Sequence, residues 1–305
     1  MDDHLRRSEQ EFLGSPADER ARRRLQAELA RLANLDDRHL WKQADPGSQD
    51  LVLQVVERLL GPAYELQGAG SYAVADQVHR IGAYVHLPTE LVLHLLPGGS
   101  FVMGSNEGPE REQPTRTVHV APLLLGRLPT TQASWDRVGG EDSRNWHGPE
   151  LPVEGVTYHA VQTWLGVTGG GLRLPSEAEW EYACRAGSQS RFFWGDTMDE
   201  EFCWFGEGAE WTTHPPSAHV DRPNAFGLVD MVGNVAEWCE DTYADGYEHA
   251  PSDGSPYRGR SSLRVVRGGD SFNRASHCRT AYRSMTRATD RGAGIGFRVA
   301  RSFPL

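Results

Sequence analysis

Hydrophobic residues in the first 60 positions follow two helical repeats. The segment Ser15–Asp18 has the composition of a helix start, and leucines recur at helical spacing over 25–32. A second apolar stripe runs from Leu51 to Leu59 and ends at Gly61, which precedes a proline. The pattern therefore predicts two helices in this part of the chain.

The pattern then changes to short apolar runs. Tyr64–Leu66 and Ile81–Leu96 are typical of strands, so residues 1–90 are expected to form a helical appendage that leads into a hairpin. The apolar stripes of this appendage could dock on the larger body of the same chain or on another protein. Docking within the chain is the usual outcome.

From residue 91 onward, short apolar runs alternate with Gly, Pro, Asn and Asp, and tryptophans are scattered throughout. Only Tyr158–Leu165 and Ser176–Arg185 have helical patterns in this region. In the second, Ser176 is a suitable N-cap and acidic residues fill the first turn. We therefore expect residues 91–305 to form a loop-rich α+β domain.

Composition excludes several classes of protein. Of 305 residues, 38% are hydrophobic and 24% are charged, which excludes a disordered or collagen-like chain. No stretch reaches the roughly 18 to 20 apolar residues of a membrane span, and the first residues lack an apolar signal core. The four cysteines, at 184, 203, 239 and 278, form no C-x2-C pair. We expect a cytoplasmic protein with reduced thiols and no membrane contact.

Charge is distributed unevenly along the chain. The net charge is −11, yet the segment from Arg258 to the end carries eleven arginines and two aspartates, a net +9. A basic segment can bind nucleic acid, but this one contains no lysine. Pairing of its arginines with carboxylates of the acidic body is the simpler interpretation, so nucleic acid is not expected as a partner.

The most specific signal is a series of five phrases in a fixed order. They are LPGGSFVMGS (96–105), PVEGVT (152–157), RLPSEAEWEYA (173–183), PNAFGLVDMVGNVAEW (223–238), and RGG (267–269) with GFRVA (296–300). This series resembles the formylglycine-generating enzyme or sulfatase-modifying-factor family, also called the FGE-sulfatase family. The resemblance covers about two thirds of the chain and implies a C-type-lectin-like fold, in which a small twisted sheet lies within extensive loops.

The family contains both catalysts and binding proteins, so the resemblance leaves the function open. In its formylglycine-generating members, a C-x4-C pair between the Arg-Gly-Gly and Gly-Phe-Arg phrases holds copper(I) and oxidises a substrate cysteine. Here the interval from Arg267 to Arg298 contains only Cys278, and Asn273 stands five residues before it. We therefore expect no copper site and no catalytic residue.

A second branch of the family, the ergothioneine-type sulfoxide synthases, holds iron with an H-x3-H-x-E helix. No two of the 12 histidines in this chain are four positions apart, so that site is not encoded. His86 and His94 flank an apolar strand. We expect them to be hydrogen-bonded or exposed rather than metal ligands.

The resemblance also implies a structural calcium ion. The matching positions are Asp230, Gly233, Val235 and Glu237, where two side chains and two backbone carbonyls would supply the hard oxygen ligands that calcium prefers. The alternative is that the two carboxylates cap turns or accept hydrogen bonds from buried arginines.

The C-terminal stretch matches the family's substrate-facing surface. It offers aromatic, cationic and small polar side chains, the mixture typical of recognition surfaces. The predicted ligand-binding residues are Asp270, Phe272, Arg274, His277, Tyr282, Ser284 and Arg287.

These observations favour a non-catalytic, ligand- or protein-binding member of the family with a protein partner. Such a protein could be an accessory subunit of a bacterial signalling, protease or defence assembly, with the helical appendage as its contact. One alternative is a retroelement-diversified display protein, although Met285 argues against it. The other is a formylglycine-generating-type oxidoreductase in which Cys239 or Cys184 lies close to Cys278.

Overall fold

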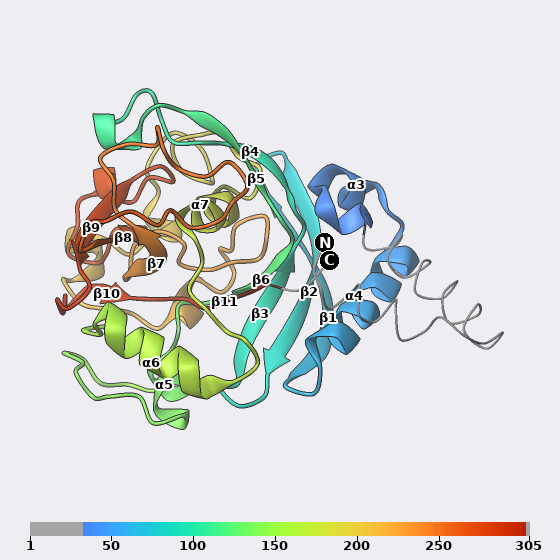
Figure 1. Ribbon diagram of the computed structural model, residues 1–305, viewed down its shortest axis with the longest axis horizontal. Coiled ribbons are helices and arrows are strands. Elements are labelled where there is room, and N and C mark those ends of the chain that lie inside the picture. Colours follow the sequence, from blue (N-terminus) through green and yellow to red (C-terminus); the bar gives the residue numbers. More distant parts are fainter. Residues whose placement is uncertain (1–32, 303–305) are drawn as a thin grey trace.

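The computed structural model describes residues 33–302, so the helix predicted from Ser15 lies outside the described residues (Figure 1). Its α-helices are α3 (Arg38–Gln43), α4 (Pro46–Leu60), α5 (Gln132–Arg137), α6 (Tyr158–Thr168) and α7 (Glu177–Arg185). Its strands are β1 (Tyr64–Val74), β2 (Gln77–His86), β3 (Leu91–Leu96), β4 (Gly99–Met103), β5 (Arg116–Val120), β6 (Leu123–Gly126), β7 (Ala236–Thr242), β8 (Leu263–Arg267), β9 (Arg283–Arg287), β10 (Ile295–Gly296) and β11 (Ala300–Ser302). Short 3-10 helices occupy Ala33–Asp36, Glu110–Glu112, Glu200–Phe202, Gly206–Ala209, Pro216–His219 and Ala275–His277.

Helix α4 confirms the predicted second apolar stripe. Asp45 caps its start by accepting a hydrogen bond from the Ser48 amide (3.0 Å), and Pro46 occupies the first turn. The helix ends at Gly61, whose φ of 77° lies in the left-handed region that favours glycine.

A five-stranded sheet in the order β1-β2-β3-β6-β11 receives this helix. The predicted hairpin is longer than expected, because β1 extends to Val74, and a turn after His86 divides the apolar run 81–96 into β2 and β3. Leu53 lies over Gly82 so closely that any side chain at Gly82 would collide with it. The Tyr84 hydroxyl also donates to the Leu53 carbonyl (2.8 Å).

The apolar face of α4 therefore docks within its own chain, which confirms that expectation. Figure 1 shows α3 and α4 on one side of the sheet, and α5, α6, α7 and strands β7 to β10 on the other. Strands from both sides of residue 90 pair in this sheet, as Val85 and Val92 do in β2 and β3. The domain boundary near residue 90 stays a prediction.

The larger body is built as the loop-rich pattern predicts. Both expected helices are present as α6 and α7, and α7 begins with a capping box in which Ser176 and Glu179 exchange hydrogen bonds. The prediction missed the short helix α5, whose N-cap is Thr131. A four-stranded sheet, β10-β7-β8-β9, and a β4-β5 hairpin complete the α+β fold.

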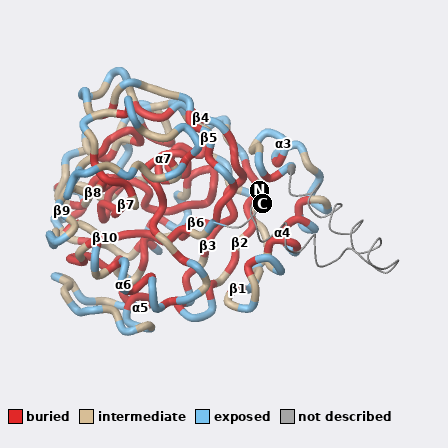
Figure 2. Tube along the Cα trace, in the orientation of Figure 1, coloured by how far each residue is buried: buried red, intermediate tan, exposed pale blue. Residues whose placement is uncertain are grey.

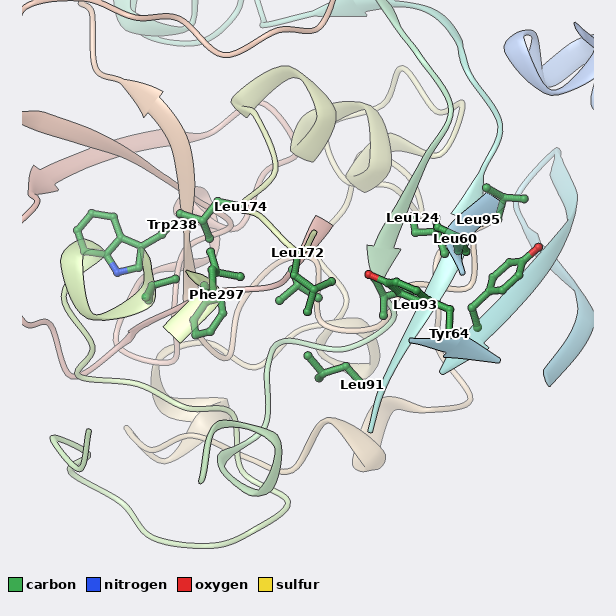
Figure 3. Packing of buried hydrophobic residues seen from close by; sticks show 14 of the residues in the cluster. Leu60, Tyr64, Leu91, Leu93, Leu95, Leu124, Leu172, Leu174, Trp238 and Phe297 are labelled. Atoms are coloured by element: carbon green, nitrogen blue, oxygen red, sulfur yellow. The ribbon is translucent and has the colours of Figure 1, made fainter. Parts of the chain in front are cut away.

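The core extends across the five-stranded sheet. Figure 2 shows the interior of the body as buried and the outer loops as exposed. In Figure 3, Leu60 and Tyr64 lie beside Leu93, Leu95 and Leu124. Buried aromatic residues hold the loop-rich half, where Trp135 stacks on Trp164 with ring centroids 5.5 Å apart.

Both flanking histidines are hydrogen-bonded through Nδ1, as expected. Nδ1 of His94 is 2.9 Å from the Phe226 carbonyl oxygen, and Nδ1 of His86 is 2.8 Å from the Thr89 hydroxyl. No helix within 33–302 is both long enough and apolar enough to span a bilayer.

Candidate functional site

The predicted ligand surface is spread over three places. Asp270, Phe272 and Arg274 lie in the loop after β8, His277 stacks on Tyr282 with centroids 4.7 Å apart, and Ser284 and Arg287 lie on the edge strand β9. Arg274 and Arg287 are exposed, Tyr282 is buried, and the other four are partly buried. The structure thus brings together parts of the set rather than one continuous patch.

A cavity of about 600 Å³ opens beside this segment. It is lined by the loop after β4, the segment 185–196 and residues 276–281. None of the seven predicted residues lines it. Other residues of the same stretch of sequence do, namely Ser276, Arg279 and Thr280. The family resemblance therefore identified the correct segment but not the residues that face the cavity. We name this cavity the polar groove.

Two arginines of the polar groove are held by buried carboxylates. Arg279 makes a two-pronged contact with Glu112 (2.6 and 2.7 Å), and Arg185 donates to Glu181 (2.9 Å) and to the Gly104 carbonyl (3.1 Å). Such planar pairs fix both position and orientation. Arg191 also lines the groove, and within 33–302 its side chain pairs with no carboxylate. Its guanidinium lies over the Phe192 ring, 5.8 Å from the ring centroid, and an ion pair with a ligand would use this group.

Helix α7 contributes Arg185 to the lining of the groove. It carries Glu177, Glu181 and Arg185 on one face, four residues apart, and Arg267 bridges the two carboxylates at 2.9 and 2.7 Å. Burial would raise the pKa of Glu181, but Arg185 and Arg267 outweigh it and lower that pKa. Arg283 adds a further contact to Glu177 (2.6 Å). The Glu181 carboxylate thus remains charged in the core.

These contacts confirm the simpler interpretation of the basic C-terminal segment. Six of its eleven arginines pair with carboxylates that precede residue 258. They are Arg258, Arg267, Arg279, Arg283, Arg291 and Arg298. The absence of a nucleic-acid partner stays a prediction.

The four cysteines are free thiols, and all four are buried. The sequence suggested Cys239 or Cys184 as a neighbour of Cys278, but the thiol whose pKa responds to the Cys278 side chain is that of Cys203. Burial, followed by the influence of Cys278, raises the pKa of Cys203 well above its ordinary value. Cys203 is 2% exposed and Cys278 is 0% exposed, and neither lines the polar groove.

The loop that carries Cys203 presents residues that the sequence analysis missed. Glu210 and Trp211 both adopt left-handed backbone conformations, with φ of 50° and 58°, and Trp211 is 53% exposed. Consecutive non-glycine residues in this region are uncommon and tend to cluster at functional sites. Gly206 of the same loop lies against the Asn273 carbonyl, so this loop adjoins the Cys278 segment.

The predicted calcium residues are already engaged with protein groups. Both oxygens of Glu237 accept hydrogen bonds from Arg298 (2.7 to 3.0 Å), and one also accepts from Trp180 (2.7 Å). The two oxygens of Asp230 are occupied by His219 (2.9 Å) and Asn234 (2.8 Å).

A guanidinium thus lies where a cation beside Glu237 would bind, and these side chains do not fit a calcium ion well. The remaining predicted ligands, Gly233 and Val235, would offer only backbone carbonyls. Within 33–302, no group of three or more His, Cys, Asp or Glu side chains could hold a metal. The geometry favours the hydrogen-bonding alternative, and calcium stays a prediction.

Asp270 has the only carboxyl group among the predicted ligand-binding residues, and its pKa is shifted. Burial raises its pKa to about 6, although the Phe272 amide donates to it (2.9 Å). Phe272 in turn stacks on Trp146 with centroids 5.4 Å apart. Trp146 is therefore a further surface residue, which only the fold could place there.

Comparisons with known proteins agree with this architecture. Residues 86–303 match the domain described as sulfatase-modifying factor enzyme 1-like, or FGE-sulfatase. The chain is 35% identical to the formylglycine-generating enzyme of Bos taurus over 57% of this chain and 50% of that protein. It is 32% identical to the serine/threonine-protein kinase pkn1 of Chlamydia caviae, over 70% of this chain and 38% of that protein.

A solved structure is also similar. PvdO from Pseudomonas aeruginosa superposes with a TM-score of 0.66 at 30% identity, covering 72% of this chain and 98% of PvdO. The chain thus spans half the length of the bovine relative and 38% of the kinase, but nearly the whole of PvdO.

Proposed function

The chain belongs to the FGE-sulfatase family, and from this premise we propose that it is a non-catalytic member that binds a peptide segment of a protein partner in the polar groove. The observation that carries the proposal is the burial of both neighbouring thiols, at 2% and 0% exposure, away from the groove. Thiol chemistry on a protein substrate requires an accessible thiolate, and a buried thiol cannot reach such a substrate. The groove, in contrast, is open and polar.

The lining of the groove suits an extended peptide. Its walls are rich in Gly, Ser, Thr, Asn and Gln, whose small polar groups suit backbone amides and carbonyls. The carboxylates Glu107 and Asp196 also line it, so an acidic side chain of the peptide would have to bind beside Arg191. Protein partners at such sites contribute a few dominant contacts. The groove, rather than the helical appendage, is therefore our proposed contact, because the apolar face of α4 is already buried against the sheet.

The relatives support a role as a recognition module. The similarity to pkn1 of Chlamydia caviae covers 38% of that protein, which its name describes as a kinase. A domain of this kind can therefore be one part of a larger signalling protein. By analogy we propose that this chain is an accessory or regulatory component of such an assembly.

Selection from a displayed library of random peptides tests the binding proposal. We expect the intact chain to enrich peptides that contain Asp or Glu, and Arg191→Ala to bind them at least about tenfold more weakly, or about 1.4 kcal/mol. The control is Arg137→Ala on α5, outside the groove, which should bind like the wild type. Absence of enrichment, or equal binding by Arg191→Ala, would contradict the proposal.

A formylglycine-generating-type oxidoreductase is the second candidate, because the contact between Cys203 and Cys278 places two sulfurs together. Two such thiolates would suit copper(I), a soft ion. The protein would be reconstituted with copper(I) and incubated in air with a cysteine-containing sulfatase peptide, with an active formylglycine-generating enzyme in parallel. We expect no formylglycine in the peptide by mass spectrometry. Conversion that disappears in Cys278→Ala would establish the second candidate.

A further inference from the structure

We propose that Cys203 and Cys278 form an oxidisable thiol pair, which an organic hydroperoxide or a small disulfide converts into a reversible disulfide. The bond would join the loop after η3 (Glu200–Phe202) to the segment that follows β8. This inference does not depend on whether the polar groove binds a peptide.

The two thiols come from distant parts of the sequence but from neighbouring backbone segments. The Asn234 amide donates to the Trp204 carbonyl (2.9 Å), and the Gly233 amide donates to the Gly268 carbonyl (2.9 Å). The Ser271 amide donates back to the Asn234 carbonyl (3.0 Å). Residues 233–234 therefore lie between the two cysteine-bearing segments and hold both in place.

Two glycines leave the space that the sulfurs occupy. A Cβ atom at Gly233 would lie 2.6 Å from the Cys203 sulfur, closer than real Cβ atoms approach, and one at Gly269 would lie 3.3 Å from the Cys278 sulfur. The Cys278 side chain also contributes to the raised pKa of Cys203, so the two side chains are neighbours before any oxidation. A disulfide then needs a short approach of the two sulfurs rather than a rearrangement of the fold.

The other two thiols lack this arrangement. Cys184 lies within α7, and the Cys239 thiol lies 4.0 Å from the Glu237 carbonyl oxygen. Both are buried free cysteines like the proposed pair. They therefore serve as internal controls for burial and for general oxidation.

The chemistry balances with a named oxidant. The thiols of Cys203 and Cys278 together release two protons and two electrons as the S–S bond forms. With a hydroperoxide, the O–O bond breaks and yields an alcohol and water; with a small disulfide, its S–S bond breaks and yields two thiols. Because Cys203 and Cys278 are buried, the oxidant must enter during local opening, so reaction should be slow.

The expected consequence is a stiffer loop face. Cross-linking positions 203 and 278 closes a long loop of the unfolded chain. That constraint should raise the Tm by roughly 5 to 10 °C. The cross-link would also fix the loop that presents Trp211 against the segment that carries Arg274.

The test uses the full chain treated with cumene hydroperoxide or oxidised glutathione, then alkylated and digested without reduction. We expect a cross-linked peptide pair containing Cys203 and Cys278, its loss after dithiothreitol, and a Tm increase on oxidation. Cys278→Ala should abolish the oxidative increase in Tm, whereas Cys239→Ala, the matched buried control, should retain it. The mass spectrum of the wild type is decisive even where a variant folds poorly. Unreacted thiols, sulfinic acids without a cross-link, or a disulfide to Cys184 or Cys239 would overturn the inference.

Discussion

Replacing Arg267 by methionine is expected to lower the free energy of unfolding by about 3 to 5 kcal/mol. Arg267 is 0% exposed and bridges Glu177 and Glu181, while also donating to the Thr280 carbonyl (2.8 Å). Methionine matches much of its length but leaves the two carboxylates buried with fewer positive partners. The loss arises mainly from that uncompensated charge, and urea denaturation measures it.

The matched control is Arg291→Met. Arg291 pairs with Glu141 at 2.8 Å, but the side chains are 47% and 59% exposed. An exposed ion pair contributes less than about 1 kcal/mol, so this variant should unfold almost like the wild type. If Arg267→Met were equally mild, the buried network would not be the main support of the groove.

Replacing His79 by leucine is expected to reduce the sensitivity of the protein to acid. His79 is 3% exposed, its ring packs at a tilt against Phe226 with centroids 4.9 Å apart, and neither ring nitrogen has a hydrogen-bond partner. Burial, together with the positive charges of Lys42 and Arg38, lowers its pKa to about 4. The unfolded chain therefore takes up this proton at a higher pH than the folded chain does.

Because the unfolded chain is protonated first, the free energy of unfolding falls as the pH falls. The contribution of neutral His79 is complete above pH 6.5 and is lost as the pH falls from there towards 4. At pH 5 the wild type should lose about 2 kcal/mol that His79→Leu retains, relative to pH 7. The difference between variants is the quantity to measure, because Asp270, with its raised pKa, opposes the trend.

Urea denaturation of both proteins at pH 5 and pH 7 gives this difference. His159→Leu, at an exposed position on α6, is the control and should leave the pH dependence of the wild type unchanged. Equal pH dependence in the wild type and His79→Leu would show that His79 is hydrated in the native protein.

The sequence was most informative where local chemistry decides the structure. Gly61 after an apolar stripe, and Ser176 with Glu179, predicted the end of α4 and the start of α7 because caps act within a few residues. The family phrases also predicted the α+β fold, which the match over 86–303 confirms. Helix α5 was missed because its six residues carry too little periodicity to be recognised.

The candidate site was less accessible to sequence reasoning. Contact between Cys203 and Cys278 depends on hydrogen bonds through residues 233–234, and no local pattern encodes them. The left-handed backbone at Trp211 could not be predicted from the sequence either, because glycine is the usual signal for that conformation. Only the family resemblance indicated the segment that lines the polar groove. The residues it predicted nearest to the groove lie one or two positions from the lining residues in the sequence.

The strand order of the five-stranded sheet has a consequence for biosynthesis. Its outer strand β11 contains Ala300–Ser302 and pairs with β6, whereas β1, β2 and β3 all precede β6 in the chain. After β6, residues 127–299 must therefore leave the ribosome before this layer can close. Until then the nascent β6 edge has an open neighbour position, and a chaperone that shields exposed strands would be most useful in that interval.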